Sequence, residues 1–181
     1  GIDPRAFIRA MLVNLKKGGI VQGGSTITQQ LAKNLFFSFD KTLVRKFKEL
    51  LMAFQIESTF PKEDILEAYS NLVYFGNGAY GVDEASIVYF GKRSRSLTLL
   101  QAAVLAGTVR SPNKFNPFND RALAMKRAGT VLSRMVSEGF IDKSQKGHAL
   151  NSELGLIKKR TKYNNNHYFV DAVVEELNSI Y

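Results

Sequence analysis

Along most of this chain, apolar positions recur three or four residues apart, which is the spacing of one face of an α-helix. The first such run follows Pro4 and stops at a pair of glycines. Ser25 or Thr26 is then expected to cap a helix that continues to about Phe37. The opening third of the sequence therefore predicts helices separated by flexible glycine joints.

The same periodicity predicts further helices at residues 42–57, 61–72, 82–90, 98–106, 120–138, 143–150 and 168–178. The helix at 42–57 carries one apolar stripe, whose members are Leu43, Phe47, Leu50, Leu51 and Phe54. Gly91, Gly107 and Gly139 are interpreted as the residues that follow helix ends. The fold class is therefore mainly α.

Strand signals are weak. The best candidate is the segment 155–161, whereas 74–81, with its three glycines, is predicted to be a structured loop. Residues 1–150 are interpreted as one domain, and 151–181 as a C-terminal extension that leads toward a following module.

Composition adds a strong positive charge. Lys and Arg number 25 against 16 Asp and Glu, a formal charge of +9 with a pI of about 9.8. This indicates an anionic partner, such as nucleic acid, an acidic membrane surface or a phosphorylated substrate, or else a solvated basic face. The chain has no Cys, which excludes disulfides and a cysteine nucleophile, and its two His exclude a His-rich metal site.

The sequence contains no uninterrupted apolar run near ~20 residues, the length that spans a bilayer. It opens without an initiator Met, at Gly1-Ile2-Asp3-Pro4. We interpret the chain as an excised fragment, with any export signal or membrane anchor expected upstream.

The most informative segment is 23–34, which reads Gly-Gly-Ser-Thr-Ile-Thr-Gln-Gln-Leu-Ala-Lys-Asn. On a helix, Thr26, Gln30 and Lys33 stand at i, i+4 and i+7, so their side chains could converge on one ligand. Glycines permit close approach of the backbone, and a helix N-terminus offers free N–H groups to a phosphate. The alternative is an ordinary capped helix with a solvated polar face, because the glycines match no nucleotide-binding fingerprint.

Two further groups of residues allow two interpretations each. Arg45 and Glu49 are four residues apart, so they either share a ligand or form a surface salt bridge. Phe36, Phe37 and Phe39 lie near Lys41 and could touch an anionic membrane, although the pattern alone favours the core.

The segment 23–34 resembles the signature of the family 51 peptidoglycan glycosyltransferases, the polymerase domains of class A penicillin-binding proteins and of monofunctional transglycosylases. Further blocks resemble this family in the same order, up to about Ile141. They are Arg45-Lys46-Phe47-Lys48-Glu49, the segment 65–82, Tyr89-Phe90-Gly91-Lys92, Leu105-Ala106-Gly107, Asn116-Pro117 and Arg127. The segment 167–173 resembles the approach to a transpeptidase module, which favours a class A penicillin-binding protein.

One departure is large. The family's first motif has the form Glu-Asp-x-x-Phe-x-x-His-x-Gly, and its Glu is held to be the catalytic base. Gly1-Ile2-Asp3 resembles only the end of that block, so the base is expected upstream of Gly1. The 181 residues alone are therefore expected to make no glycan.

The resemblance implies a lysozyme-like helical fold with a small membrane-facing lobe that includes Phe36, Phe37 and Phe39. It implies polymerisation of lipid II into β-1,4-linked glycan with release of polyprenyl pyrophosphate. Glu49 matches the family's second essential carboxylate, with a role in orienting basic residues, holding a divalent cation (Mg or Mn) or positioning the leaving group. The implied substrate-binding residues are Ser25, Thr26, Gln30, Lys33, Asn34, Arg45 and Lys46.

The implied partners are lipid II, the lipid-linked glycan chain, an anionic membrane surface and other cell-wall synthesis proteins. The implied location is the outer face of the cytoplasmic membrane. A nucleic-acid-binding module is the first alternative, but no reading motif supports it. A lysozyme-like hydrolase and an inactive scaffold domain are the others; a hydrolase needs no diphosphate-binding residues.

Overall fold

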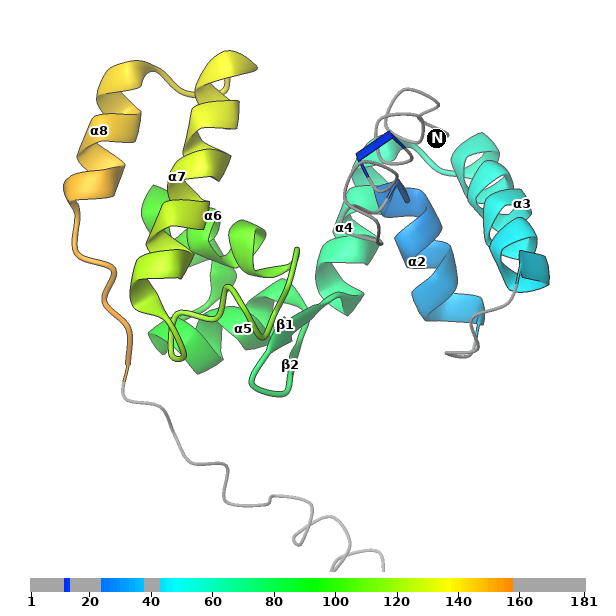
Figure 1. Ribbon diagram of the computed structural model, residues 1–181, viewed down its shortest axis with the longest axis horizontal. Coiled ribbons are helices and arrows are strands. Elements are labelled where there is room, and N and C mark those ends of the chain that lie inside the picture. The colour runs from blue at the N-terminus through cyan, green and yellow to red at the C-terminus, as the bar shows by residue number, and fades with distance from the viewer. Residues whose placement is uncertain (1–11, 14–23, 38–42, 158–181) are drawn as a thin grey trace, which may run out of the picture.

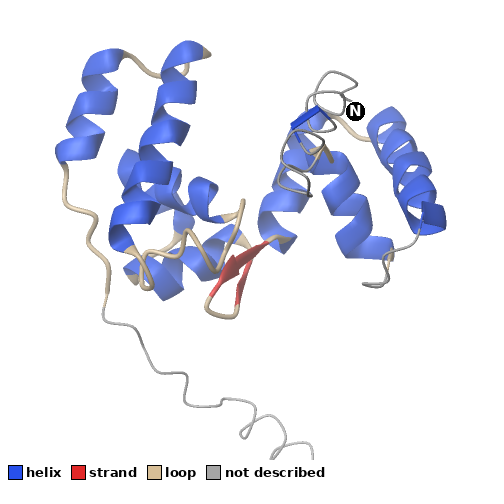
Figure 2. Cartoon of the chain, viewed as in Figure 1, coloured by secondary structure: helices blue, strands red, loops and turns tan. Residues whose placement is uncertain are grey.

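The computed structural model describes residues 12–13, 24–37 and 43–157. The predicted helices after Pro4 and at 168–178 lie outside this part, apart from 12–13. The elements are α2 (Ile27–Phe36), α3 (Leu43–Thr59), α4 (Lys62–Leu72), β1 (Tyr74–Gly76), β2 (Ala79–Tyr80), α5 (Val82–Phe90), the short 3₁₀ helix η1 (Ser94–Ser96), α6 (Leu99–Thr108), α7 (Arg121–Ser137) and α8 (Lys143–Asn151). The mainly helical fold that the periodicity predicted is confirmed (Figure 2).

The described helices form two lobes, with the β1–β2 hairpin between them (Figure 1). In the first lobe, α2 packs against both α3 and α4. In the second, α6 packs along α7, while α5 contacts the hairpin and α6, and α8 lies against α7. The chain passes from one lobe to the other through α4, the hairpin and α5. This connection therefore joins the first lobe to the second.

Side-chain caps explain why the helices begin where the sequence predicted. The Thr26 hydroxyl accepts a hydrogen bond from Gln29 N at 3.3 Å and so starts α2. Asp120 starts α7 in the same way, accepting from Leu123 N at 2.8 Å. Each cap satisfies an N–H group that has no partner inside its helix. The predicted cap of α2 is therefore Thr26.

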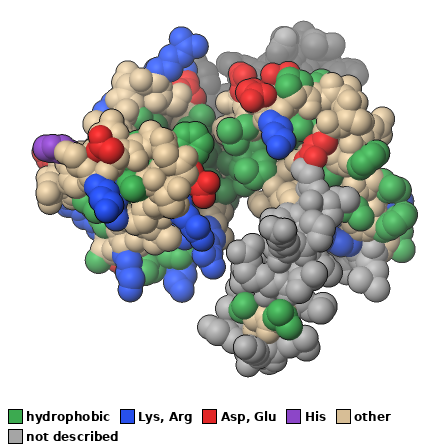
Figure 3. All heavy atoms as spheres, turned by 90° about the horizontal axis from the view of Figure 1, so that it is seen from above, with side chains coloured by type: hydrophobic (Ala, Val, Ile, Leu, Met, Phe, Trp, Pro, Cys, Tyr) green, Lys and Arg blue, Asp and Glu red, His purple; other side chains and the backbone are tan. Residues whose placement is uncertain are grey.

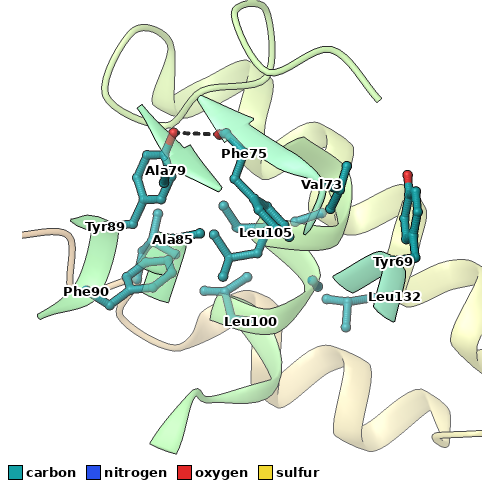
Figure 4. Packing of buried hydrophobic residues seen from close by; sticks show 14 of the residues in the cluster. Tyr69, Val73, Phe75, Ala79, Ala85, Tyr89, Phe90, Leu100, Leu105 and Leu132 are labelled. Carbon is teal, nitrogen blue, oxygen red and sulfur yellow. Dashed lines mark hydrogen bonds between the residues drawn. The ribbon is translucent and has the colours of Figure 1, made fainter. Parts of the chain in front are cut away.

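The core of the second lobe lies under the hairpin (Figure 4). Tyr89 of α5 is fully buried, and its hydroxyl donates to the carbonyl oxygen of Phe75 in β1 at 2.9 Å. This bond satisfies the only polar atom of a side chain surrounded by Leu100, Leu105 and other apolar residues. Because burial disfavours a charged phenolate, the pKa of Tyr89 lies above its usual value.

The structured loop predicted at 74–81 contains a short antiparallel hairpin. Asn77 and Gly78 both have positive φ, 51° and 76°, between paired strands. Asn-Gly is the preferred pair for such a two-residue turn, so the sequence did carry the signal. Conversely, residues 155–157, the described part of the predicted strand at 155–161, form no strand.

The interpretation of Gly107 as a residue that follows a helix end was wrong. Gly107 lies inside α6, which continues to Thr108, and it is buried against α7. A Cβ atom at this position would come within 2.9 Å of Arg127 Cγ. The glycine therefore permits the close approach of two helices instead of ending one.

Candidate functional site

The first two turns of α3 hold a carboxylate between two cationic side chains. Glu49 is 1% exposed, and one of its carboxylate oxygens accepts a hydrogen bond from the guanidinium of Arg45. Its other oxygen accepts from Nζ of Lys46 at 2.8 Å. Lys46 Nζ also donates to the hydroxyl of Ser25 at 2.7 Å. The structure therefore brings four of the predicted site residues into one cluster.

Arg45 and Glu49 do form an ion pair, but the interpretation of it as a surface salt bridge was wrong, because the Glu49 carboxylate is buried. Glu49 is enclosed, and the side chain of Arg45 is only 17% exposed, whereas that of Lys46 is 50% exposed. A buried carboxylate needs compensating charge, which Arg45 and Lys46 supply here. Of these two cations, Lys46 is the more accessible.

Three predicted ligands on α2 have different surroundings. Thr26 is the helix cap, and the side-chain oxygen of Gln30 accepts from the hydroxyl of Tyr69 in α4 at 3.2 Å. Burial raises the pKa of that phenol, so it is a neutral donor at pH 7. Lys33 lies about 10 Å further along the helix axis than Thr26, at ~1.5 Å per residue. The convergence of Thr26, Gln30 and Lys33 on one ligand stays a prediction.

Among the described residues, neither Lys33 nor Asn34 has a side-chain hydrogen bond or ion pair. Lys33 is partly buried and Asn34 is exposed. Both lie in the second half of α2, toward its C-terminal end. They therefore stand apart from the cluster around Glu49.

A second contact between α2 and α3 was missed from the sequence. The Thr28 hydroxyl donates to a carboxylate oxygen of Glu57, near the C-terminal end of α3. Thr28 is buried although it lies in a run of polar residues. The N-terminal turn of α2 is thus held near both ends of α3, by Lys46 at one and by Glu57 at the other. These contacts hold the start of α2 beside α3, with Ser25 against Lys46.

Three members of the apolar stripe on α3, Phe47, Leu51 and Phe54, face outward. Phe47 is 62% and Phe54 68% exposed, and Leu51 and Val44 are exposed as well. The inward face is instead formed by Glu49, Ala53 and Ile56 at i, i+4 and i+7. We call Val44, Phe47, Leu51 and Phe54 the outer face of α3. Figure 3 shows hydrophobic side chains along the outer edge of this lobe.

The predicted membrane-contacting residues fall near the same lobe. Phe36, in the last turn of α2, is exposed, and Phe37 after it is partly exposed. The pattern-based preference for a core position of Phe36 was therefore wrong, while Phe39 lies outside the described residues. None of the helices that the structure describes combines the length and apolar character needed to cross a membrane.

The described residues of the cluster do not by themselves form a metal site. Within the described residues, no group of three His, Asp or Glu side chains lies close enough to hold a cation. Glu49 is a single carboxylate whose oxygens already face Arg45 and Lys46. Divalent cations prefer several oxygen ligands, and two adjacent positive charges oppose their binding.

The fold and cluster define a two-lobed helical protein with cationic donors beside a helix N-terminus. Residues 1–136 match the family described as transglycosylase. The chain belongs to this family. That match and the relatives below confirm the family resemblance expected from the segment 23–34.

Relatives with high identity include two penicillin-binding proteins 1A. The one from Aquifex aeolicus is 51% identical over 96% of this chain, and the one from Escherichia coli is 48% identical over 80%. The chain spans 24% and 17% of the lengths of these relatives. A crystal structure of penicillin-binding protein 1A from Haemophilus influenzae is similar, with a TM-score of 0.50 and 27% identity over 83% of this chain and 19% of that one.

Proposed function

We propose that this domain takes part in polymerising lipid II into β-1,4-linked glycan strands. In this reaction the 4-hydroxyl of the N-acetylglucosamine of lipid II attacks the anomeric carbon of the lipid-linked chain. A new C–O bond forms, the bond to the pyrophosphate breaks, and polyprenyl pyrophosphate departs with the bonding electrons. The hydroxyl proton passes to a base, expected to be the Glu of the family's first motif. Membership of the transglycosylase family supports this proposal.

The observation that carries the proposal is the cationic cluster at the start of α2. The leaving diphosphate gains negative charge as its bond breaks, so positive groups held in advance at that position lower the barrier. Lys46 is half exposed, and Ser25 beside it is exposed. The N-terminal N–H groups of α2 offer further donors to an anion. We assign Lys46, Ser25 and these N–H groups to the diphosphate.

We assign Glu49 a positioning role. Its carboxylate is enclosed and engaged by Arg45 and Lys46, so it faces the two cations and not the solvent. An acid in this place holds both cationic side chains in a fixed geometry before the substrate arrives. Of the three roles left open by the sequence, orienting the basic residues is the one this geometry favours.

The remaining predicted ligands take more peripheral roles in the proposal. Thr26 fixes the start of α2, and Gln30 ties that helix to Tyr69. Lys33 and Asn34, further along α2, are assigned to a more distant part of the long substrate. Any divalent cation at the diphosphate is expected to bind mainly through phosphate oxygens, because Glu49 is already engaged.

The outer face of α3, with Phe36 and Phe37, is proposed to contact the anionic membrane that carries lipid II. An apolar surface combined with a charge of +9 suits anionic headgroups over an acyl layer. The proposed location is the outer face of the cytoplasmic membrane, with other cell-wall synthesis proteins as partners.

The test measures lipid II polymerisation, by gel separation of glycan strands, on the product of the complete reading frame. Lys46→Gln is expected to lower the rate at least about a hundredfold, since it removes the accessible cation from the leaving group. Lys48→Gln, an exposed neighbour on α3, is the matched control and should retain full activity.

Equal activity of the two variants would remove Lys46 from the site. Shortening of preformed glycan strands, without polymer growth, would favour the hydrolase alternative. Neither activity in the unmodified protein, under conditions where it is folded, would favour the scaffold alternative.

A further inference from the structure

The second lobe carries a pocket that the proposed polymerase site does not use. It has a volume of about 510 Å³ and lies against α7 and the C-terminal end of α6. Arg110, Arg127 and Arg134 contribute three guanidinium groups, and Glu138 contributes the one carboxylate among the lining residues. The lining is therefore positively charged, by two units on balance.

The central arginine lacks a polar partner. Arg127 Nε is fully buried and has no hydrogen-bond partner in the described structure. Its guanidinium carbon lies 5.8 Å from the ring centroid of Phe115. Burial, with Arg110 nearby, lowers the pKa of Arg127. A buried donor without an acceptor carries an energetic cost.

The remaining lining limits the kind of anion. Val131, Met135 and Phe140 give the pocket an apolar wall beside the arginines, and the exposed Phe140 side chain lies at its edge. A free inorganic ion leaves such a wall unused. A peptide with a carboxylate next to an apolar side chain contacts both the arginines and the apolar wall. A guanidinium binds a carboxylate with two parallel hydrogen bonds.

A lipid phosphate is the less favoured source of negative charge. The outer face of α3 lies in the other lobe, whereas Phe140 is the only large apolar side chain among the described residues of α6–α8 and their connecting loops that is strongly exposed. A membrane-facing pocket would need more apolar surface around it than this.

We infer that the pocket formed by Arg110, Arg127 and Arg134 is a docking site for an acidic peptide segment of a partner protein. The carboxylate binds the arginines, and the neighbouring apolar residue packs on Val131 and Met135. This site is independent of the proposed polymerase chemistry.

The test uses isothermal titration calorimetry on the 181-residue chain. The probe is an acetylated and amidated hexapeptide in which aspartate and leucine alternate. The double variant Arg110→Gln/Arg134→Gln is expected to weaken binding at least about tenfold, because two charge-assisted contacts are lost. Both residues are exposed, so folding should be retained. Arg127 is left intact because its side chain packs against Gly107.

The matched control is Arg121→Gln/Lys126→Gln, which removes the same charge from exposed positions of α7 outside the pocket. The inference is overturned if both double variants weaken binding equally, or if the peptide binds as well with asparagine in place of aspartate. It is also overturned if the Arg110/Arg134 variant loses binding to phosphatidylglycerol vesicles and not to the peptide, since a lipid would then be the occupant.

Discussion

Nζ of Lys46 lies 2.7 Å from the hydroxyl oxygen of Ser25, although the two residues are 21 positions apart. The same ammonium group lies 2.8 Å from a carboxylate oxygen of Glu49. One side chain therefore joins the start of α2 to the buried acid of α3. The two segments that the sequence singled out separately, 23–34 and 45–49, form a single site through this contact.

This relationship predicts a binding role for the Ser25 hydroxyl. Ser25→Ala removes an acceptor that holds Lys46, so the ammonium group becomes less ordered before ligand arrives. We expect binding of polyprenyl pyrophosphate to weaken by about tenfold, the effect of one hydrogen bond to a charged group. Calorimetry on the 181-residue chain provides the measurement. Ser58→Ala, on the exposed part of α3, is the control and should bind as the unmodified chain does.

A second prediction concerns the buried acid. Glu49→Gln removes the charge of a buried carboxylate that accepts from Arg45 and Lys46, and Arg45 is mostly enclosed. We expect the free energy of unfolding to fall by about 3 kcal/mol, at the low end for a broken buried ion pair because Lys46 can reach water. Urea denaturation followed by circular dichroism measures this change.

Glu67→Gln, an exposed carboxylate on α4, serves as the control and should change stability by no more than about 0.5 kcal/mol. If the two substitutions had equal effects, Glu49 would not be needed to hold its cationic neighbours. Diphosphate binding at a temperature where the Glu49 variant is still folded separates its positioning role from its effect on stability.

Much of the fold could be predicted from local patterns. Caps such as Thr26 and Asp120 act within one helical turn, so their effect is visible in a short stretch of sequence. The same is true of Gly91, whose positive φ of 68° ends α5 as predicted. Gly107 differs because its role depends on Arg127, a residue of another helix. Local spacing contains no information about such a contact.

The orientation of α3 could not be predicted from periodicity, for a physical reason. Periodicity identifies two faces of a helix but assumes that the more apolar face packs inward. Here the apolar face of Phe47 and Phe54 is exposed, and the buried face carries Glu49. A buried acid is favourable only with charged partners, here Arg45 and Lys46 one turn earlier, and apolar periodicity does not register them. The orientation of α3 about its own axis therefore accounts for both the burial of Glu49 and the exposure of Phe47.

This orientation of α3 leads to a third prediction, which concerns membrane binding. Phe47→Ser/Phe54→Ser removes two large apolar side chains from the outer face of α3 while leaving its buried face unchanged. If each ring buries about half of its surface in the bilayer, each contributes about 1 kcal/mol, and vesicle affinity should fall by about thirtyfold. Co-sedimentation with phosphatidylglycerol vesicles measures this, and Phe140→Ser in the other lobe should have no effect. A matching loss in both variants would indicate nonspecific adsorption of exposed aromatic rings.

The last prediction tests the close approach of α6 and α7. Gly107→Ala places a Cβ atom 2.9 Å from Arg127 Cγ, near the backbone end of that side chain, so the two helices must separate slightly. Overpacking of this kind costs about 1–3 kcal/mol, and the better helix propensity of Ala offsets up to about 1 kcal/mol of it. We expect a net loss of about 1 kcal/mol in the free energy of unfolding, measured by urea denaturation.

Gly147→Ala provides the matched control, because Gly147 lies in α8 with no atom near its Cβ position. There only the propensity changes, so stability should rise by about 0.5–1 kcal/mol. Equal stabilisation by both substitutions would show that α6 and α7 can move apart without loss, and that Gly107 is not required for their packing.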